Sequence, residues 1–178
     1  MSAWKTNKSI KYLLFPLALF YWGIVYWRNL FYSMGFFISK KLPTKVISVG
    51  NITTGGTGKT PMVIWLSKLL ENKGYKPGIV SRGYGGSSPR KPLIVNDETA
   101  VKVSGDEPLI IFKNTLRPVC ISSNRIAAIR MLLEDTDTDV IISDDGLQHY
   151  KMDRDIEIVI FDGNRGIGNG LCLPAGPL

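Results

Sequence analysis

The sequence has 178 residues, 44% of them hydrophobic, and a formal net charge of +7. This length suffices for one domain with a substantial core. The two cysteines, Cys120 and Cys172, lack CxxC spacing, which excludes a disulfide framework or a CxxC metal or redox site, and we interpret both as reduced, buried thiols. The positive charge suits an anionic partner, which can be a phospholipid surface, a phosphorylated substrate or a nucleic acid.

An apolar, aromatic segment covers residues 12–39, with Arg28 as its one charge and lysines beyond both ends. A helix of this length would extend about 42 Å, more than the ~30 Å hydrocarbon thickness of a bilayer. Pro16, Gly23 and Arg28 interrupt a spanning helix, so we favour a bent helix or helical pair lying in the membrane interface over a single span. The aromatic side chains suited to the headgroup level are Tyr12, Tyr21, Trp22, Tyr26, Trp27 and Tyr32.

Two other interpretations of residues 12–39 are weaker. A cleaved signal peptide would have a shorter apolar run followed by a small-residue cleavage pattern. A helix buried against the domain would not explain so many aromatic residues. We therefore predict a membrane-associating helical segment at 1–42, followed by a second domain at 43–178.

After Pro43, predicted strands alternate with predicted helices. The strands are expected at 45–49, 78–81, 93–95, 118–122, 140–143 and 156–161, the last two as buried strands. The helices are expected at 60–72, 106–113 and 124–134, with Asn124 as the cap of the third. This alternation predicts an α/β fold of the P-loop NTPase type, a mainly parallel sheet with helices on both faces.

A glycine-rich segment, GNITTGGTGKTP at 50–61, follows the first predicted strand and opens a helix. The backbone N–H groups of such a turn and the positive end of the helix form an anion cradle. We predict that Lys59 reaches the β- and γ-phosphates of a nucleotide and that the Thr60 hydroxyl binds Mg²⁺. The predicted nucleotide-binding residues are Asn51, Thr53, Thr54, Gly55, Gly56, Thr57, Gly58, Lys59 and Thr60. A chance glycine-rich turn is the alternative, and Thr53 departs from the glycine of the strict GxxxxGK[ST] pattern.

An acidic pair, Asp144 and Asp145, ends the predicted strand at 140–143. A strand beside the phosphate-loop strand often delivers aspartate to the metal, so both are predicted Mg²⁺ ligands. The alternative is a simple turn signal, since Gly146 follows. No NKxD motif is present, so ATP is expected rather than GTP. ATPases that position proteins on membranes carry a lysine just before the glycine pair, where this chain has Thr54.

Six segments occur in the order seen in tetraacyldisaccharide 4'-kinases, and the chain resembles that family from the phosphate loop to residue 178. The segments are GNITTGGTGKTP, SRGYGG, GDEP, NRIAA, DDGLQHY and LPAGPL. The resemblance implies transfer of the ATP γ-phosphate to the 4'-hydroxyl of a tetraacylated disaccharide 1-phosphate, a step of lipid A synthesis. It implies ATP and Mg²⁺ as cofactors, and membrane phospholipids as partners at the cytoplasmic face of the bacterial inner membrane.

The resemblance also implies roles for single residues. Asp106 is similar to the family's catalytic base, where position alone would favour a helix cap, and Lys59 assists catalysis at the phosphates. Arg82 and Tyr84 would face the disaccharide, or else lie in a solvated turn. Arg125 would contact substrate phosphate, or else be a surface charge. Gln148 and His149 follow the metal strand and are expected to support it, although a lone histidine is more often structural.

Family members continue beyond the point where this chain stops, so we expect a fragment with nucleotide-site features but little kinase activity. Two other functions compete with the kinase. A membrane-bound ATPase that switches a partner protein would hydrolyse ATP without lipid and dimerise with ATP. A nucleic-acid-binding ATPase is disfavoured, because the aromatic residues cluster in an apolar run rather than among basic residues.

Overall fold

The computed structural model describes residues 8–37, 39–53, 58–87, 91–147, 149–164, 166–167 and 169–177. The chain divides into two compact units. One unit comprises residues 1–39, 51–57 and 161–178, and the other comprises residues 40–50 and 58–160. The larger unit holds nearly all of the sheet and four of the helices described below.

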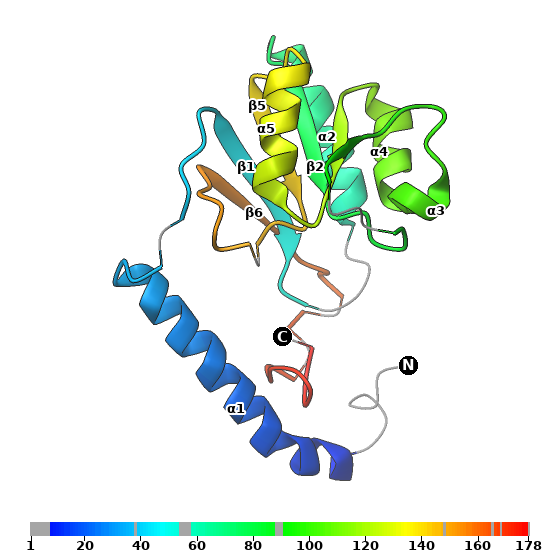
Figure 1. Ribbon diagram of the computed structural model, residues 1–178. Helices are drawn as coiled ribbons and strands as arrows, with labels where there is room; N and C mark the ends of the chain where they lie inside the picture. The colour runs from blue at the N-terminus through cyan, green and yellow to red at the C-terminus, as the bar shows by residue number, and fades with distance from the viewer. Residues whose placement is uncertain are drawn as a thin grey trace. The chain divides into compact units, whose positions relative to one another are not determined.

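A six-stranded sheet with the order β3-β4-β2-β5-β1-β6 forms the centre of the larger unit (Figure 1). Its strands are β1 (Lys45–Asn51), β2 (Pro77–Ser81), β3 (Leu93–Ile94), β4 (Val119–Ile121), β5 (Val140–Asp144) and β6 (Ile156–Ile160). β5 pairs in parallel with β1 and β2, and β2 with β4, whereas β3 is antiparallel to β4. The prediction of an α/β fold with a mainly parallel sheet is confirmed.

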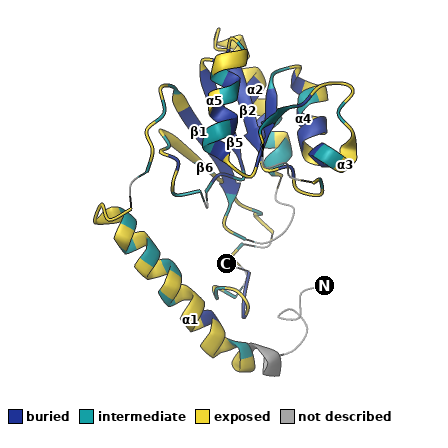
Figure 2. Ribbon diagram, viewed as in Figure 1, coloured by how far each residue is buried: buried dark blue, intermediate teal, exposed yellow. Residues whose placement is uncertain are grey.

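Helices cover both faces of this sheet. The helices of the larger unit are α2 (Lys59–Asn72), α3 (Val101–Ser104), α4 (Asp106–Thr115) and α5 (Arg125–Asp135). One buried cluster joins Val63 of α2 and Ile111 of α4 to strand residues such as Ile142. A second cluster joins Ile129 of α5 to the alternate strand residues, such as Ile141. Because neighbouring residues of a strand point to opposite faces, β1, β2, β4 and β5 each contribute buried residues to both clusters, which appear dark blue in Figure 2. β6 packs Ile158 and Ile160 against the first cluster.

Local chemistry explains where two of the helices begin. The side chain of Asn124 accepts a hydrogen bond of 3.2 Å from the Ala127 N–H, so the predicted cap of α5 is confirmed. Gly105 separates α3, which was not predicted, from α4. It has a φ of 78°, and a β-carbon there would lie 2.0 Å from the carbonyl oxygen of Tyr84, so only glycine fits.

Two burial predictions are wrong. β6 is an edge strand rather than a buried one, with Ile156 53% and Val159 47% exposed, because β1 is its only neighbour in the sheet order. Cys172 is only partly buried, whereas Cys120 is fully buried as predicted. Burial raises the pKa of the Cys120 thiol to about 11.

The smaller unit contains α1 (Lys8–Ser33), one helix that includes Pro16. Most of its large side chains are exposed, including Trp22 at 52% and Trp27 at 57% (Figure 2). Successive aromatic rings pack along it, with Trp22 and Tyr26 stacked 5.5 Å apart. Within the described part of the chain, no helix combines the length and the hydropathy needed to cross a membrane.

Candidate nucleotide and metal site

The carboxyl ends of β1 and β5 meet at one edge of the sheet. Val49 of β1 is in register with Asp144, the last residue of β5. Lys59 is the first residue of α2, and the ammonium of Lys59 lies 2.8 Å from the Asp145 carboxylate. Lys59, at the start of α2, therefore lies beside the acidic pair.

Asp144 is a buried carboxylate with few donors. Its side chain accepts a hydrogen bond of 3.1 Å from the Ser81 hydroxyl, at the end of the neighbouring strand β2. Burial, together with the negative charges of Glu107 and Asp145, raises the pKa of Asp144 to about 6, while Ser81 and Lys59 oppose the shift. A buried anion surrounded in this way is stabilised by a cation.

The turn after β5 is tightly packed. Asp145 has a φ of 54°, in the left-handed region that aspartate tolerates better than most residues. A β-carbon on Gly146 would lie 2.5 Å from both the Ser48 and the Ser143 hydroxyl oxygens. The Arg154 guanidinium donates hydrogen bonds of 3.1 and 2.9 Å to the carbonyl oxygens of Gly146 and Leu147, and it pairs with Glu157 at 2.9 Å.

Arg125 lies in the interior, at the start of α5. It is 3% exposed, and its two terminal nitrogens donate to the carbonyl oxygens of Ser122, at 3.2 Å, and Asp144, at 2.9 Å. Burial lowers its pKa to about 10, although Asp144 and Asp145 partly offset the effect. The alternative of a solvated surface charge is therefore wrong, and Arg125 ties the end of β5 to the loop that precedes α5.

The remaining polar groups lie around this edge. Arg82 and Tyr84 are exposed, and the Arg82 guanidinium donates to the Tyr84 hydroxyl at 3.0 Å and lies 5.2 Å from the centre of its ring. Asp106 is the exposed first residue of α4, and Gly105 rather than Asp106 occupies the cap position. Burial, together with the charges of Arg125 and Arg82, lowers the pKa of the half-buried His149.

Comparison with known proteins identifies the family. A family model described as tetraacyldisaccharide-1-P 4'-kinase matches residues 10–178. The chain belongs to the tetraacyldisaccharide-1-P 4'-kinase family. The resemblance of the six sequence segments is confirmed.

Relatives in this family are similar over the whole of this chain. The tetraacyldisaccharide 4'-kinases of Actinobacillus succinogenes and Pasteurella multocida are each 51% identical over all of this chain and 55% of their own length. A crystal structure of LpxK from Aquifex aeolicus in complex with ATP is 35% identical, with a TM-score of 0.84, and the match covers 95% of this chain and 54% of that chain. The chain thus spans about 55% of the length of these curated relatives.

Several predicted family residues have no described environment. Thr54, Gly55, Gly56, Thr57 and Gln148 lie outside the described residues. Asn51 and Thr53 belong to the smaller unit, where the Asn51 side-chain amide donates to the Thr53 carbonyl oxygen. Gly58 has a φ of 85° immediately before α2, and Thr60 is the second residue of that helix.

The acidic pair has the donor chemistry that Mg²⁺ prefers. Magnesium in nucleotide sites is held by one or two carboxylates, together with hydroxyl, phosphate and water oxygens. Asp144, Asp145 and the Thr60 hydroxyl are such donors, and the buried charge of Asp144 favours a cation. No group of three His, Cys, Asp or Glu side chains gathers into a closed metal site within the described ranges.

Three residues of this site were not predicted: Ser81, Glu107 and Arg154. Ser81 and Glu107 lie inside the SRGYGG and GDEP segments, next to Arg82 and Asp106. Their position in the chain was the available signal, since Ser81 ends β2 and Glu107 lies in the first turn of α4. Arg154 lies in no recognised segment, and only the structure reveals its contact with the turn.

Proposed function

We propose that this chain forms the nucleotide-binding part of an ATP-dependent kinase that phosphorylates the 4'-hydroxyl of a tetraacyldisaccharide 1-phosphate in lipid A biosynthesis. The observation that carries the proposal is the 2.8 Å approach of Lys59 to Asp145 at the end of β5. A phosphate-binding lysine beside a metal-binding carboxylate is the arrangement that phosphoryl transfer requires. Family membership over residues 10–178 supports it.

Each residue has a defined role in this proposal. Lys59 neutralises the terminal phosphates, and Thr60, Asp144 and Asp145 hold Mg²⁺, which supplies charge stabilisation to the phosphates when bound. Arg125 and Ser81 fix Asp144 in place, through its carbonyl and carboxylate oxygens respectively. Asp106, exposed at the start of α4, accepts the proton of the sugar hydroxyl. Arg82 and Tyr84 bind the disaccharide from their exposed loop.

We further propose that α1 attaches the protein to the cytoplasmic face of the inner membrane by lying in the interface. Its exposed aromatic side chains support this, because tryptophan and tyrosine partition to the headgroup level. The acyl chains of the substrate can then remain in the bilayer while the disaccharide is phosphorylated at the surface. The excess of basic residues would attract both an anionic bilayer and the substrate phosphate.

Binding and transfer can be tested separately. We expect the 178-residue chain to bind ATP, more tightly with Mg²⁺ than with EDTA, in a titration followed by calorimetry. A radiolabel transfer assay with ATP and the lipid acceptor tests the phosphoryl-transfer step of the proposal. Absence of ATP binding would contradict the nucleotide site, whereas lipid-independent hydrolysis with ATP-dependent dimerisation would favour an ATPase switch instead.

A further inference from the structure

A cavity of about 520 Å³ opens at the edge of the sheet opposite the candidate nucleotide site. It is lined by residues 41–45, which lead into β1, by Asp139 just before β5, and by residues 153–155 just before β6. Its volume lies in the range typical of small-ligand sites. The family comparisons and the proposed kinase reaction assign nothing to it.

Most charges around the cavity are already engaged. Lys45 pairs with Asp155 at 2.7 Å, and the second oxygen of Asp155 accepts from the Val46 N–H at 2.9 Å. Arg154 is committed to Glu157 and to the turn after β5. The Thr44 hydroxyl donates to the Asp139 carbonyl oxygen at 2.6 Å. These contacts form the frame of the cavity rather than its binding groups.

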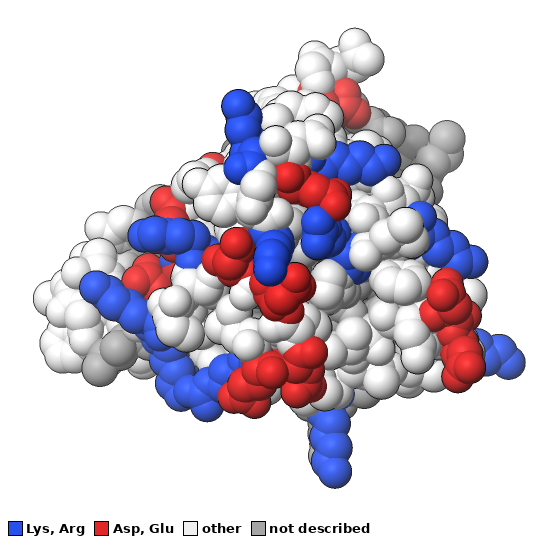
Figure 3. All heavy atoms as spheres, turned by 90° about the horizontal axis from the view of Figure 1, so that it is seen from above, with Lys and Arg blue, Asp and Glu red and all other residues white. Residues whose placement is uncertain are grey.

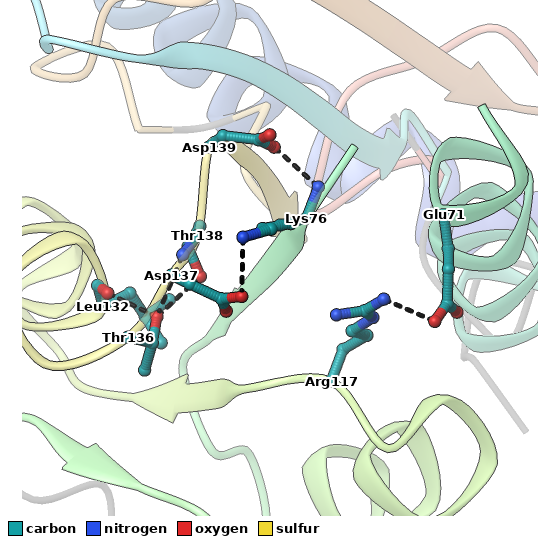
Figure 4. Close-up of polar contacts among 8 residues, drawn as sticks. All are labelled: Glu71, Lys76, Arg117, Leu132, Thr136, Asp137, Thr138 and Asp139. Atoms are coloured by element: carbon teal, nitrogen blue, oxygen red, sulfur yellow. Dashed lines mark hydrogen bonds and ion pairs between the residues drawn. The ribbon is translucent and has the colours of Figure 1, made fainter. Parts of the chain in front are cut away.

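Three groups remain available to a ligand. Of the described residues, none pairs with the Lys41 ammonium, and Lys41 is exposed. Asp139 uses one oxygen to accept from the Lys76 N–H at 2.7 Å (Figure 4), and Asp153 uses one to accept from the Arg154 N–H at 3.0 Å. Within the described part of the chain, each carboxylate thus keeps its second oxygen for a further donor. The cavity offers one cation and two carboxylate acceptors.

The surrounding surface does not favour a purely anionic or purely cationic ligand. Figure 3 looks onto this edge of the sheet and shows acidic and basic side chains intermingled rather than a patch of one sign. Neighbouring charges on this edge neutralise one another, as in the ion pairs of Lys76 with Asp137 and of Arg117 with Glu71 (Figure 4). The complementary ligand therefore carries both charges itself.

We propose that this cavity binds the headgroup of a phospholipid that carries a primary ammonium next to its phosphodiester, the phosphoethanolamine class. Asp139 and Asp153 accept hydrogen bonds from the ammonium, and Lys41 pairs with the phosphate. A choline headgroup has no N–H to donate, and a glycerol headgroup has no cation. The site would thus distinguish membrane lipids by their headgroup.

Chain length supports a lipid source, an argument that rests on the membrane attachment proposed for α1. Lys41 follows Ser33, the last residue of α1, by eight residues, which span at most about 28 Å. A helix lying in the interface therefore keeps the cavity within about that distance of the headgroups. Membrane attachment would present the cavity to the lipid at high local concentration.

The site can be tested without a membrane. Glycerophosphoethanolamine and glycerophosphocholine are titrated into the full chain, and amide chemical shifts are followed by NMR. We expect saturable shifts at residues 41, 42, 44, 45, 139 and 153 with glycerophosphoethanolamine and none with glycerophosphocholine. Lys41→Gln, and Asp139→Asn with Asp153→Asn, should each weaken binding by about tenfold or more. Both asparagines keep an oxygen for the existing N–H contacts, so the fold is retained. Lys68→Gln and Asp97→Asn are exposed controls that should leave binding unchanged.

A second experiment, with vesicles, tests whether the site binds the headgroup within a membrane lipid as well as the free headgroup. Phosphatidylcholine vesicles with and without phosphatidylethanolamine are sedimented with the wild-type chain and with the variants. We expect phosphatidylethanolamine to increase binding of the wild type and not of Asp139→Asn with Asp153→Asn. Equal shifts with both soluble headgroups, or none, would overturn the site itself. Failure to bind any vesicle, with the soluble result intact, would instead contradict the membrane attachment of α1 and leave ATP binding unaffected.

Discussion

The ammonium of Lys59 lies 2.8 Å from the Asp145 carboxylate, so the first residue of α2 is joined to the residue that follows β5. Both side chains are partly exposed, at 20% and 35%, so the pair contributes no more than about 1 kcal/mol to the free energy of unfolding. In the proposed site, the pair serves ligand binding rather than stability.

We expect Lys59→Met to weaken ATP binding by at least about tenfold with or without Mg²⁺, because a charge-assisted phosphate contact is lost. Asp145→Asn should reduce ATP affinity only in the presence of Mg²⁺ and leave the affinity in EDTA unchanged. Calorimetric titration in Mg²⁺ and in EDTA distinguishes the two, with Lys68→Met as an exposed control on the same helix. Wild-type affinity for Lys59→Met would contradict the site.

Asp144 should destabilise the free chain at neutral pH. An acid whose pKa rises on folding holds its proton longer in the folded chain, so the free energy of unfolding falls as pH rises from about 4 to about 6. A rise from 3.8 to about 6 corresponds to about 3 kcal/mol. In EDTA, Asp144→Asn should therefore raise the free energy of unfolding at about pH 8, by up to that amount. Urea unfolding should show no such gain at about pH 4, where the native carboxyl is already protonated.

Gly146→Ala should reduce stability by about 1–3 kcal/mol, because the added methyl group overlaps the Ser48 and Ser143 hydroxyls. Replacing both serines by alanine should recover part of this loss. The same double replacement alone should be close to neutral or stabilising, since both hydroxyls are buried without a partner among the described residues. Gly163→Ala is the matched control, because nothing lies within 4 Å of its added methyl group. Chemical denaturation measures the free energy of unfolding of all four variants.

Arg154 should maintain the turn that carries the acidic pair. We expect Arg154→Met to cost about 1–3 kcal/mol, because the Gly146 and Leu147 carbonyl oxygens lose their donor. It should also weaken Mg²⁺-dependent ATP binding, since the turn begins at Asp145. Lys45→Met removes a neighbouring exposed charge and should change neither quantity. Loss of stability with unchanged ATP affinity would show that the turn holds its shape without Arg154.

The two thiols should differ in reactivity. Cys120 is fully buried with a pKa raised to about 11, so very little thiolate exists at about pH 8, and Cys172 is partly exposed. A thiol-specific chromogenic reagent should modify one cysteine in the native chain and two after unfolding in denaturant. The variant Cys172→Ser should show almost no native reaction.

The sheet and the central pair of the site could be predicted because their signals are local. Strands such as 140–143 are short apolar runs bounded by turn residues. The acidic pair stands at the end of one strand, and Lys59 opens the helix that follows another. Parallel pairing brings such ends to one edge, and the approach of Lys59 to Asp145 follows. The start of α5 could be predicted for the same reason, because Asn124 caps the helix with its own side chain.

The remaining features depend on which elements become neighbours. An apolar run such as Ile156–Ile160 is the same in a central strand and in an edge strand, so the exposure of β6 could not be inferred from its composition. Ser81 matters only because β2 lies beside β5, and Arg154 only because its side chain reaches the turn after β5. Arg125 was expected at a surface or a ligand, since a charged residue at the start of a helix is usually solvated.

The open flank of β6 has a practical consequence for handling the protein. On the side away from β1, no described strand pairs with β6, and an edge strand that carries exposed isoleucine and valine is a template for adding another strand. The opposite flank, β3, is only two residues long and offers little to pair with. Copies of the purified chain can therefore associate strand to strand at β6, and a lysine in place of Val159 is the substitution that should reduce this association.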